Sequence, residues 1–292
     1  MATLPVFYIN LASRPDRREF MEKQFVALGI KAERVEAVVG EQVPADLLAI
    51  HASPHQPWRL TAAELACGLS HHKAWSLIAE RQVSAAVVLE DDVELSPELL
   101  AFLDPLQLGQ PAPDLIKLET WRSKVWLGGS RRAAGTGVVQ PLYSTHLGAA
   151  GYLMYLGCAQ RSIADRRAFD VAVDQYLFGR GGPHIFDSTV LQAVPCPCVQ
   201  ISHLPSYHRD HPLRASDLKA SRSKRPGGTS RTLLRRLRRD GIKLVYGLRL
   251  IGRLLRDPRA IGRGRRPVAF VGDAAIRPRQ IAPVERFEAR RS

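Results

Sequence analysis

Cysteine is scarce in this chain of 292 residues. The four cysteines are Cys67, Cys158, Cys196 and Cys198. A single residue separates the last two, which is too tight for an ordinary zinc site, and no second close pair accompanies them. So few cysteines do not form the disulfide framework of a small secreted protein. We therefore expect buried thiols in a reducing cytoplasm.

An apolar run long enough to cross a bilayer is also missing. Residues 133–160 contain no charged residue, but their polar side chains, their glycines and Pro141 would make a poor spanning helix. The first residues lack the cationic region and the cleavage site of a secretory leader. We expect neither a transmembrane segment nor a signal peptide, and we expect a cytoplasmic protein.

Acidic residues are nearly absent from one segment, which explains the formal net charge of +14. Residues 219–266 contain 17 basic and 2 acidic residues, a net charge of 17 − 2 = +15. Residues 1–218 contain 20 basic and 23 acidic residues, a net charge of 20 − 23 = −3. The charge pattern predicts a nearly neutral domain over residues 1–215 and a basic C-terminal extension over residues 216–292.

Apolar runs alternate with helical patterns along the first of these two parts. Runs typical of strands are residues 5–10, 35–39, 85–89 and 115–119, with further strand-like material at 146–156 and 185–201. A helix is expected to begin at Thr61, because Thr61 and Glu64 have the spacing of a capping box. This alternation predicts an α/β fold with a mostly parallel sheet that helices cover on both faces.

Three consecutive acids, Glu90, Asp91 and Asp92, end the apolar run at residues 87–89. Two unit charges about 4 Å apart repel each other by roughly 1 kcal/mol in water and by more in a drier site. Residues i and i+2 of a strand share a face, so Glu90 and Asp92 can converge on one ion while Asp91 points away. Oxygen ligands favour Mg²⁺ or Mn²⁺. The alternative is a solvated acidic turn before a helix.

Four stretches together resemble glycosyltransferase family 25, the bacterial lipopolysaccharide-type transferases related to collagen galactosyltransferases. They are Val6–Leu11 with Arg14–Arg18, Glu64–His71 with Trp75, Val87–Val93, and Gly148–Tyr152 followed by Val173–Asp174. The resemblance covers residues 5–180 and implies a Rossmann-like GT-A fold. It also implies an inverting transfer of a hexose, such as galactose or glucose, from a UDP-sugar to a lipopolysaccharide, an oligosaccharide or another glycan. One departure is Ala149, where family members commonly have threonine.

The resemblance assigns a role to each acid of the triplet. Glu90 and Asp92 resemble the element that holds Mn²⁺ (or Mg²⁺) against the donor diphosphate, where the ion would stabilise the leaving group. Asp91 is expected to bind the ribose of the donor or to brace a neighbouring turn.

Other residues are expected to hold the donor. Asn10 and Arg14 follow the first strand, where the resemblance implies the nucleotide, and Arg17 could pair with phosphate. Their alternatives are a helix cap and a solvated helix face. Glu64 and His71 can share one helix face, from which His71 could bind the sugar or the phosphate. A satisfied buried histidine is the alternative.

An inverting transfer needs a carboxylate that accepts the proton of the acceptor hydroxyl. Asp174 is the first candidate for this base. Glu119, at the end of another predicted strand, is the rival.

The basic extension contains a candidate membrane-binding helix at residues 230–256. The apolar side chains that gather within an arc of about 60° are Leu233, Leu237, Leu244, Leu248, Ile251 and Leu255. Arginines lie opposite them, which predicts attachment to the anionic inner face of the cytoplasmic membrane, where lipid-linked oligosaccharide acceptors are assembled. The alternative is that the leucines cover the catalytic domain.

Two other functional classes share some of these features. A nucleic-acid-binding protein would explain the basic segment, but no nucleic-acid motif accompanies it, and we expect no nucleic-acid partner. A metal-dependent phosphohydrolase would explain the acids, but such sites usually need more metal ligands than this stretch offers.

Overall fold

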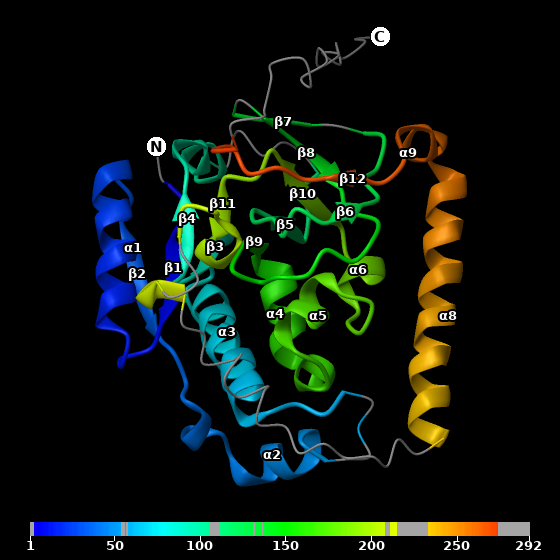
Figure 1. Ribbon diagram of the computed structural model, residues 1–292, viewed down its shortest axis with the longest axis horizontal. Coiled ribbons are helices and arrows are strands. Elements are labelled where there is room, and N and C mark those ends of the chain that lie inside the picture. Colours follow the sequence, from blue (N-terminus) through cyan, green and yellow to red (C-terminus); the bar gives the residue numbers. More distant parts are fainter. Residues whose placement is uncertain are drawn as a thin grey trace.

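The computed structural model describes residues 3–53, 56, 58–104, 111–130, 132–135, 137–207, 211–214 and 233–273. Its centre is an eight-stranded sheet with the strand order β2-β1-β3-β9-β5-β10-β8-β7 (Figure 1). The strands are β1 (Val6–Asn10), β2 (Ala32–Glu36), β3 (Ala85–Glu90), β5 (Leu115–Lys117), β7 (Arg132–Ala134), β8 (Gly137–Pro141), β9 (Gly151–Tyr155) and β10 (Val190–Val194).

Strands β1, β2, β3, β5 and β10 run in one direction, and β9 lies antiparallel between β3 and β5. The carboxyl ends of β1 and β3 therefore meet at one edge of the sheet, where Ile9 is the register partner of Glu90. The predicted α/β fold with a mostly parallel central sheet is confirmed. In open α/β sheets this edge is where ligands bind.

Helices cover both faces of the sheet (Figure 1). The helices are α1 (Pro15–Leu28), α2 (Ala45–His51), α3 (Ala62–Glu80), α4 (Leu156–Ala164), α5 (Val173–Phe178), α6 (His184–Asp187), α8 (Leu233–Arg256) and α9 (Pro258–Arg263). Short 3₁₀ turns are η1 (Gly40–Gln42), η2 (Pro97–Phe102), η4 (Arg166–Phe169), η5 (Ile201–His203) and η6 (Pro212–Arg214).

Alternation along β3 divides the core between the two faces. Val88 packs in one cluster with Trp75 of α3. Val87 and Leu89 point to the other face and pack in a second cluster with Met21 of α1. The continuous apolar run of β3 thus reflects a strand that is buried on both faces.

Helix α3 begins at the predicted capping box. Thr61 Oγ1 accepts a hydrogen bond from Glu64 N at 3.2 Å, and Glu64 Oε2 accepts one from Thr61 N at 2.9 Å. Two backbone donors at the start of the helix are therefore satisfied by side chains.

The chain after α8 returns to the domain that contains the central sheet. Strand β12 (Arg266–Pro267) pairs with β6 (Lys124–Val125), and Val268 is fully buried in the main core. A second small sheet joins β4 (Val93–Leu95) to β11 (Cys198–Gln200). The predicted boundary between residues 215 and 216 lies outside the described residues, whereas residues 266–273 pack as part of the domain that precedes it.

Within the part of the chain that the structure describes, none of the helices combines the length and the apolar character that a membrane span requires. The described cysteines are all thiols, and three of them, Cys158, Cys196 and Cys198, are buried.

We predict that Thr61→Ala lowers the free energy of unfolding by about 1 kcal/mol, because it removes the side chain that caps α3. Thr61→Ser keeps a hydroxyl at the cap and is the matched control. Urea unfolding of both variants measures the difference, and equal losses from serine and alanine would contradict the capping role.

Candidate functional site

The acidic triplet lies at the carboxyl end of β3, at the edge where the parallel strands end. Glu90 is the last residue of the strand, and the Asp91 and Asp92 side chains are buried in the turn that leads to β4. Gln200 Nε2 donates to Glu90 Oε2 at 3.3 Å and to Asp92 Oδ1 at 3.1 Å. Glu90 and Asp92 thus converge on one point, as their i, i+2 spacing predicts, and Gln200 lies between them.

Asp91 points away from that pair and toward α1. Its two carboxylate oxygens accept hydrogen bonds from Asn10 Nδ2 at 2.8 Å and from Arg17 Nη1 at 2.7 Å. Arg17 also forms an ion pair with Asp92 at 3.3 Å. Asp91 therefore joins the ends of β1 and α1 to the triplet, and a contact of Asp91 with the donor ribose stays a prediction.

Arg17 is the cation nearest to the triplet among the ion pairs described here. Burial disfavours its charge, but Asp92, Asp91 and Glu90 outweigh that effect and raise its pKa above the ordinary value. Its guanidinium also donates to Leu213 O at 2.9 Å. These groups already bind the Arg17 guanidinium. A contact between the same side chain and a phosphate stays a prediction.

The carboxylates of the triplet are not fully compensated by this arginine. Burial raises the pKa of Glu90 to about 8, and the neighbouring Asp92 and Asp91 add to the shift. Burial also raises the pKa of Asp91, although Arg17 opposes the change. A group of acids with excess negative charge is a place where a cation would be stabilised.

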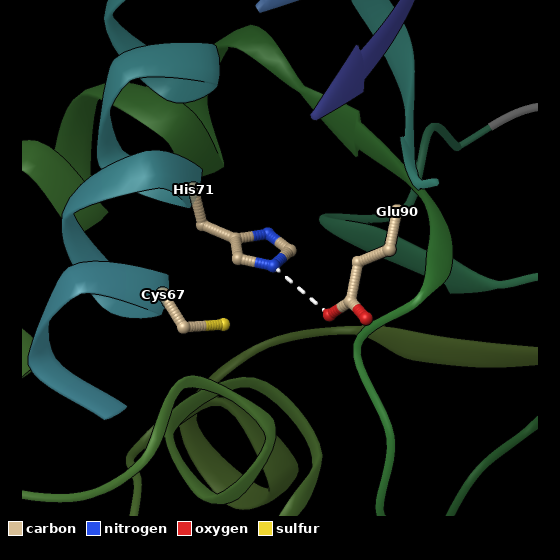
Figure 2. Close-up of side chains that lie close together, drawn as sticks. All are labelled: Cys67, His71 and Glu90. Atoms are coloured by element: carbon tan, nitrogen blue, oxygen red, sulfur yellow. Dashed lines mark hydrogen bonds and ion pairs between the residues drawn. The ribbon is translucent and has the colours of Figure 1, made fainter. Parts of the chain in front are cut away.

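Helix α3 brings His71 against the same acid. His71 Nε2 lies 3.3 Å from Glu90 Oε1 (Figure 2). On the other side of the ring, His71 Nδ1 lies 2.9 Å from the Tyr152 hydroxyl. Trp75 Nε1 donates to that hydroxyl at 2.7 Å. Burial lowers the pKa of His71 to about 4, so the imidazole is neutral at physiological pH. His71 is thus a satisfied buried histidine that also reaches the site.

Cys67 lies one helical turn before His71 and points toward the same space (Figure 2). Ligand atoms of Cys67, His71 and Glu90 lie within 4.8 Å of one another. A thiolate, an imidazole and a carboxylate suit a softer metal such as Zn²⁺, whereas Glu90 with Asp92 suits Mn²⁺ or Mg²⁺. Glu90 belongs to both sets.

Two cavities adjoin at the triplet. The larger, of about 730 Å³, lies between the end of β1, turn η1 and the start of α3, and its walls include Ser13, Arg17 and Gly40. The smaller, of about 310 Å³, is lined by Trp121, Asp174, His203 and Arg214 among others. Side chains that line both cavities are Cys67, Glu90, Asp92 and Gln200.

The two candidate bases occupy different environments. Asp174, near the start of α5, is half-buried and lines the smaller cavity, and its Oδ1 accepts a hydrogen bond from Gln175 N at 2.8 Å. Glu119 is fully buried and accepts from Lys117 Nζ and from Ala150 N, both at 2.9 Å. Burial raises the pKa of Glu119 to about 7. Asp174 lines the smaller cavity, whereas Glu119 is fully buried and lines neither cavity.

Gly148 covers this buried carboxylate. Its φ of +95° is a conformation that side chains rarely adopt, and its carbonyl accepts from Lys117 Nζ at 2.5 Å. A Cβ at this position would lie 2.3 Å from Glu119 Oε1 and 2.5 Å from Trp121 Nε1. Only glycine therefore fits between the buried ion pair and the cavity.

Most of the residues just described lie in a region that a known family model matches. The model for glycosyltransferase family 25 (LPS biosynthesis protein) matches residues 3–177, more than half of the chain. The chain belongs to glycosyltransferase family 25. Every residue that the sequence assigned to the site lies inside the matched region, whereas Gln200, His203 and Arg214 lie beyond it.

Similar proteins include a glycosyltransferase 25 family member of Drosophila melanogaster, 34% identical over 32% of this chain and 16% of its own length. Procollagen galactosyltransferase 1-B of Xenopus laevis is 33% identical over 41% of this chain and 22% of its own length. A probable inactive glycosyltransferase 25 family member 3 of Bos taurus is 32% identical over 56% and 28%, respectively. The matches thus span less than a third of these longer relatives.

Among solved structures, a glycosyltransferase involved in the glycosylation of the major capsid of PBCV-1 is similar at 11% identity and a TM-score of 0.34. The match covers 68% of this chain and 92% of that one. A likeness this distant supports no statement about substrate or mechanism.

Two further residues of the predicted site in this family 25 protein have structural partners. Arg14 forms an ion pair with Asp16 at 2.8 Å and donates to Pro212 O at 3.0 Å. Glu64 serves the cap of α3 and also lines the smaller cavity. The donor-binding roles of Arg14 and Glu64 stay predictions, as does that of Asn10, which joins Asp91 to Arg34.

Sequence reasoning missed Gln200, Trp121, His203 and Arg214. Gln200 reaches the triplet because β11 pairs with β4, with Gln200 opposite Val93. A short strand more than a hundred residues from its partner leaves no periodic signal, so only the folded chain reveals the contact.

We predict that Arg17→Met lowers the free energy of unfolding by about 3–5 kcal/mol, because it leaves the buried carboxylate of Asp91 without its cation. Arg14→Met, three residues earlier, removes a partly exposed ion pair and should cost about 1 kcal/mol or less.

Chemical unfolding of both variants tests this difference. The double variant Arg17→Met with Asp91→Asn should recover part of the loss, because the carboxylate that Arg17 compensates at the shortest distance no longer carries a charge, whereas Asp92 still lacks its ion pair. An equal cost for Arg14→Met and Arg17→Met would contradict the bracing role of the Arg17–Asp91 pair.

Proposed function

We propose that this protein is an inverting, metal-assisted transferase that moves a hexose from a UDP-sugar to a glycan acceptor such as a lipopolysaccharide oligosaccharide. The observation that carries the proposal is the position of Glu90 and Asp92, which line two adjoining cavities at the carboxyl edge of the sheet. A transferase needs such a junction, because the bond that breaks in the donor lies next to the bond that forms with the acceptor.

The larger cavity suits the nucleotide. Its volume of about 730 Å³ is in the range of small-molecule sites, and it lies beyond the end of β1, as expected for a nucleotide on an open α/β sheet. The donor diphosphate would then lie at the junction, and the hexose would point toward the smaller cavity.

The carboxylates at the junction fit a hard divalent cation. Two acidic oxygens flank the Gln200 amide, which already places a positive partial charge between them. Mn²⁺ or Mg²⁺ held by Glu90 and Asp92 would supply charge neutralisation to the leaving diphosphate. Cys67 and His71 favour a softer metal such as Zn²⁺. The ion that supports activity would therefore show which of the two sets of side chains binds it.

The smaller cavity suits the acceptor. Trp121 and His203 form an aromatic pair with ring centroids 5.3 Å apart, which offers an apolar surface to one face of a sugar ring. Asp174 in the same cavity would take the hydroxyl proton. The acceptor oxygen forms its bond to the anomeric carbon as the bond to the diphosphate oxygen breaks, UDP leaves, and the configuration inverts.

Support for the sugar and the acceptor comes from the family. The matched model is described as an LPS biosynthesis protein, and three relatives are named procollagen galactosyltransferases, which favours galactose over glucose. Other relatives carry the word inactive in their names, so turnover is the property that tests the proposal.

We predict that UDP-sugar hydrolysis requires a divalent cation and falls by about 10²-fold or more in Glu90→Ala and in Asp92→Ala, because both remove a ligand at the leaving group. Glu94→Gln changes the next acid along the chain, which lies outside both cavities, and is the matched control.

The measurement is release of UDP from a panel of UDP-sugars, with Mn²⁺, Mg²⁺, Zn²⁺ or chelator, alongside a thermal shift with UDP. Stimulation by Mn²⁺ supports the Glu90–Asp92 set. Full turnover of either alanine variant in chelator would remove the metal from the proposal.

We predict that Asp174→Asn lowers turnover by about 10²–10⁴-fold and leaves the affinity for UDP nearly unchanged, because the base acts on the acceptor. Glu119→Gln should instead lower thermal stability, because it removes the counter-charge of the buried Lys117.

Steady-state rates and UDP titrations of the two variants separate these effects. If Glu119→Gln keeps its stability and loses turnover while Asp174→Asn stays active, Glu119 is the base.

A further inference from the structure

Helix α8 is attached to the domain by one of its faces. Thr145 N donates to the Tyr246 hydroxyl at 2.8 Å, and the ring of Tyr246 lies 5.4 Å from that of Phe186. Arg253 lies over Phe186 and donates to Phe186 O at 2.9 Å. Arg249 pairs with Asp187 at 3.1 Å. Residues 246, 249 and 253 are spaced by three and four, so one helix face makes all these contacts.

The opposite face of α8 is apolar and exposed. We call its side chains the outer stripe, and they are Leu237 (61% exposed), Leu244 (64%), Leu248 (61%), Ile251 (55%) and Leu255 (70%). They fall within an arc of about 60° and extend over about 27 Å of helix. Figure 1 shows α8 along one side of the molecule. The alternative that these leucines cover the catalytic domain is therefore wrong for the outer stripe.

Cations border the outer stripe. Lys243 and Arg256 are exposed and lie on its two sides. Beyond the end of α8, Arg259 and Arg263 are exposed around Ile261, which is itself 47% exposed. The acids of this region have local partners. Asp240 pairs with Lys243 at 2.7 Å, and Asp257 accepts from Gly129 N at 2.6 Å.

We propose that α8 docks this protein on an anionic lipid surface, with the helix lying in the plane of the membrane and the outer stripe inserted between the headgroups. An apolar face bordered by arginine and lysine is the pattern of an interfacial helix. The net charge of +15 over residues 219–266 complements such a surface. This docking would hold a cytoplasmic protein at the inner face of the membrane, as the sequence predicts.

Two other occupants fit the surface less well. A second copy of this chain would bring two strongly cationic segments together, and their repulsion opposes association. A nucleic acid would engage the cations and leave the outer stripe in water. An anionic membrane satisfies both features at once.

The test uses the full-length protein and vesicles of phosphatidylcholine, with or without phosphatidylglycerol. The stripe variant carries Leu244→Gln, Leu248→Gln and Ile251→Gln. The matched control carries Val26→Gln and Ile50→Gln, which change exposed apolar side chains (83% and 54% exposed) away from α8. Circular dichroism checks that each variant is folded.

We expect the wild type and the matched control to co-sediment with the anionic vesicles and not with the neutral ones. The stripe variant should bind at least about 100-fold more weakly than the wild type, because it withdraws three apolar side chains from the bilayer. Lys243→Gln with Arg256→Gln should weaken binding about tenfold, and salt should weaken it in all cases.

Other outcomes would overturn the proposal. Equal binding by the stripe variant would show that cations alone attach the protein. A wild type that ignores vesicles but forms a dimer, which the stripe variant loses in light scattering, would assign the outer stripe to a second copy. Salt-dependent retention of an oligonucleotide without vesicle binding would assign the cations to nucleic acid. None of these binding assays contains a UDP-sugar, so their results do not depend on the proposed transferase activity.

Discussion

The crowding of three carboxylates at the end of β3, two of them buried and Glu90 partly buried, is the constraint on which the site depends. Each buried acid requires a partner, because an isolated charge in a low-dielectric interior is strongly destabilising. Asp91 takes Asn10 and Arg17, which attaches α1 and the end of β1 to the triplet. Glu90 and Asp92 share Gln200, which attaches β11. The compensation of charge thus determines where these elements lie relative to one another.

Local patterns predicted the parts of this arrangement that depend on neighbours in sequence. The capping box at Thr61 sets the start of α3, and with it the positions of Cys67 and His71 on one helix face. The i, i+2 spacing predicted that Glu90 and Asp92 lie together and that Asp91 points away, and this holds although Asp91 and Asp92 lie in the turn after β3. The apolar runs predicted the sheet, because a strand buried on both faces leaves a continuous signal.

Contacts between distant segments could not be predicted in the same way. Nothing near Gln200 indicates that it will reach an acid at position 90, because the pairing of β4 with β11 has to form first. The sequence also left open whether Asp174 or Glu119 faces a ligand, since both are acids near element ends. In the folded chain Lys117 forms a fully buried ion pair with Glu119, whereas Asp174 lines the smaller cavity. The direction of the outer stripe likewise depended on which face Tyr246 and Arg253 attach.

Gly148 has a consequence for how this protein can vary. A side chain at this position would displace both the buried Glu119 carboxylate and the Trp121 indole. The first belongs to an ion pair of the core and the second to the wall of the smaller cavity. Stability and the shape of a binding site are therefore linked at one backbone position. A substitution at Gly148 therefore changes both the stability of the core and the shape of the smaller cavity. Ala149 beside it has a φ in the ordinary range, so a different side chain at that position does not strain the backbone in this way.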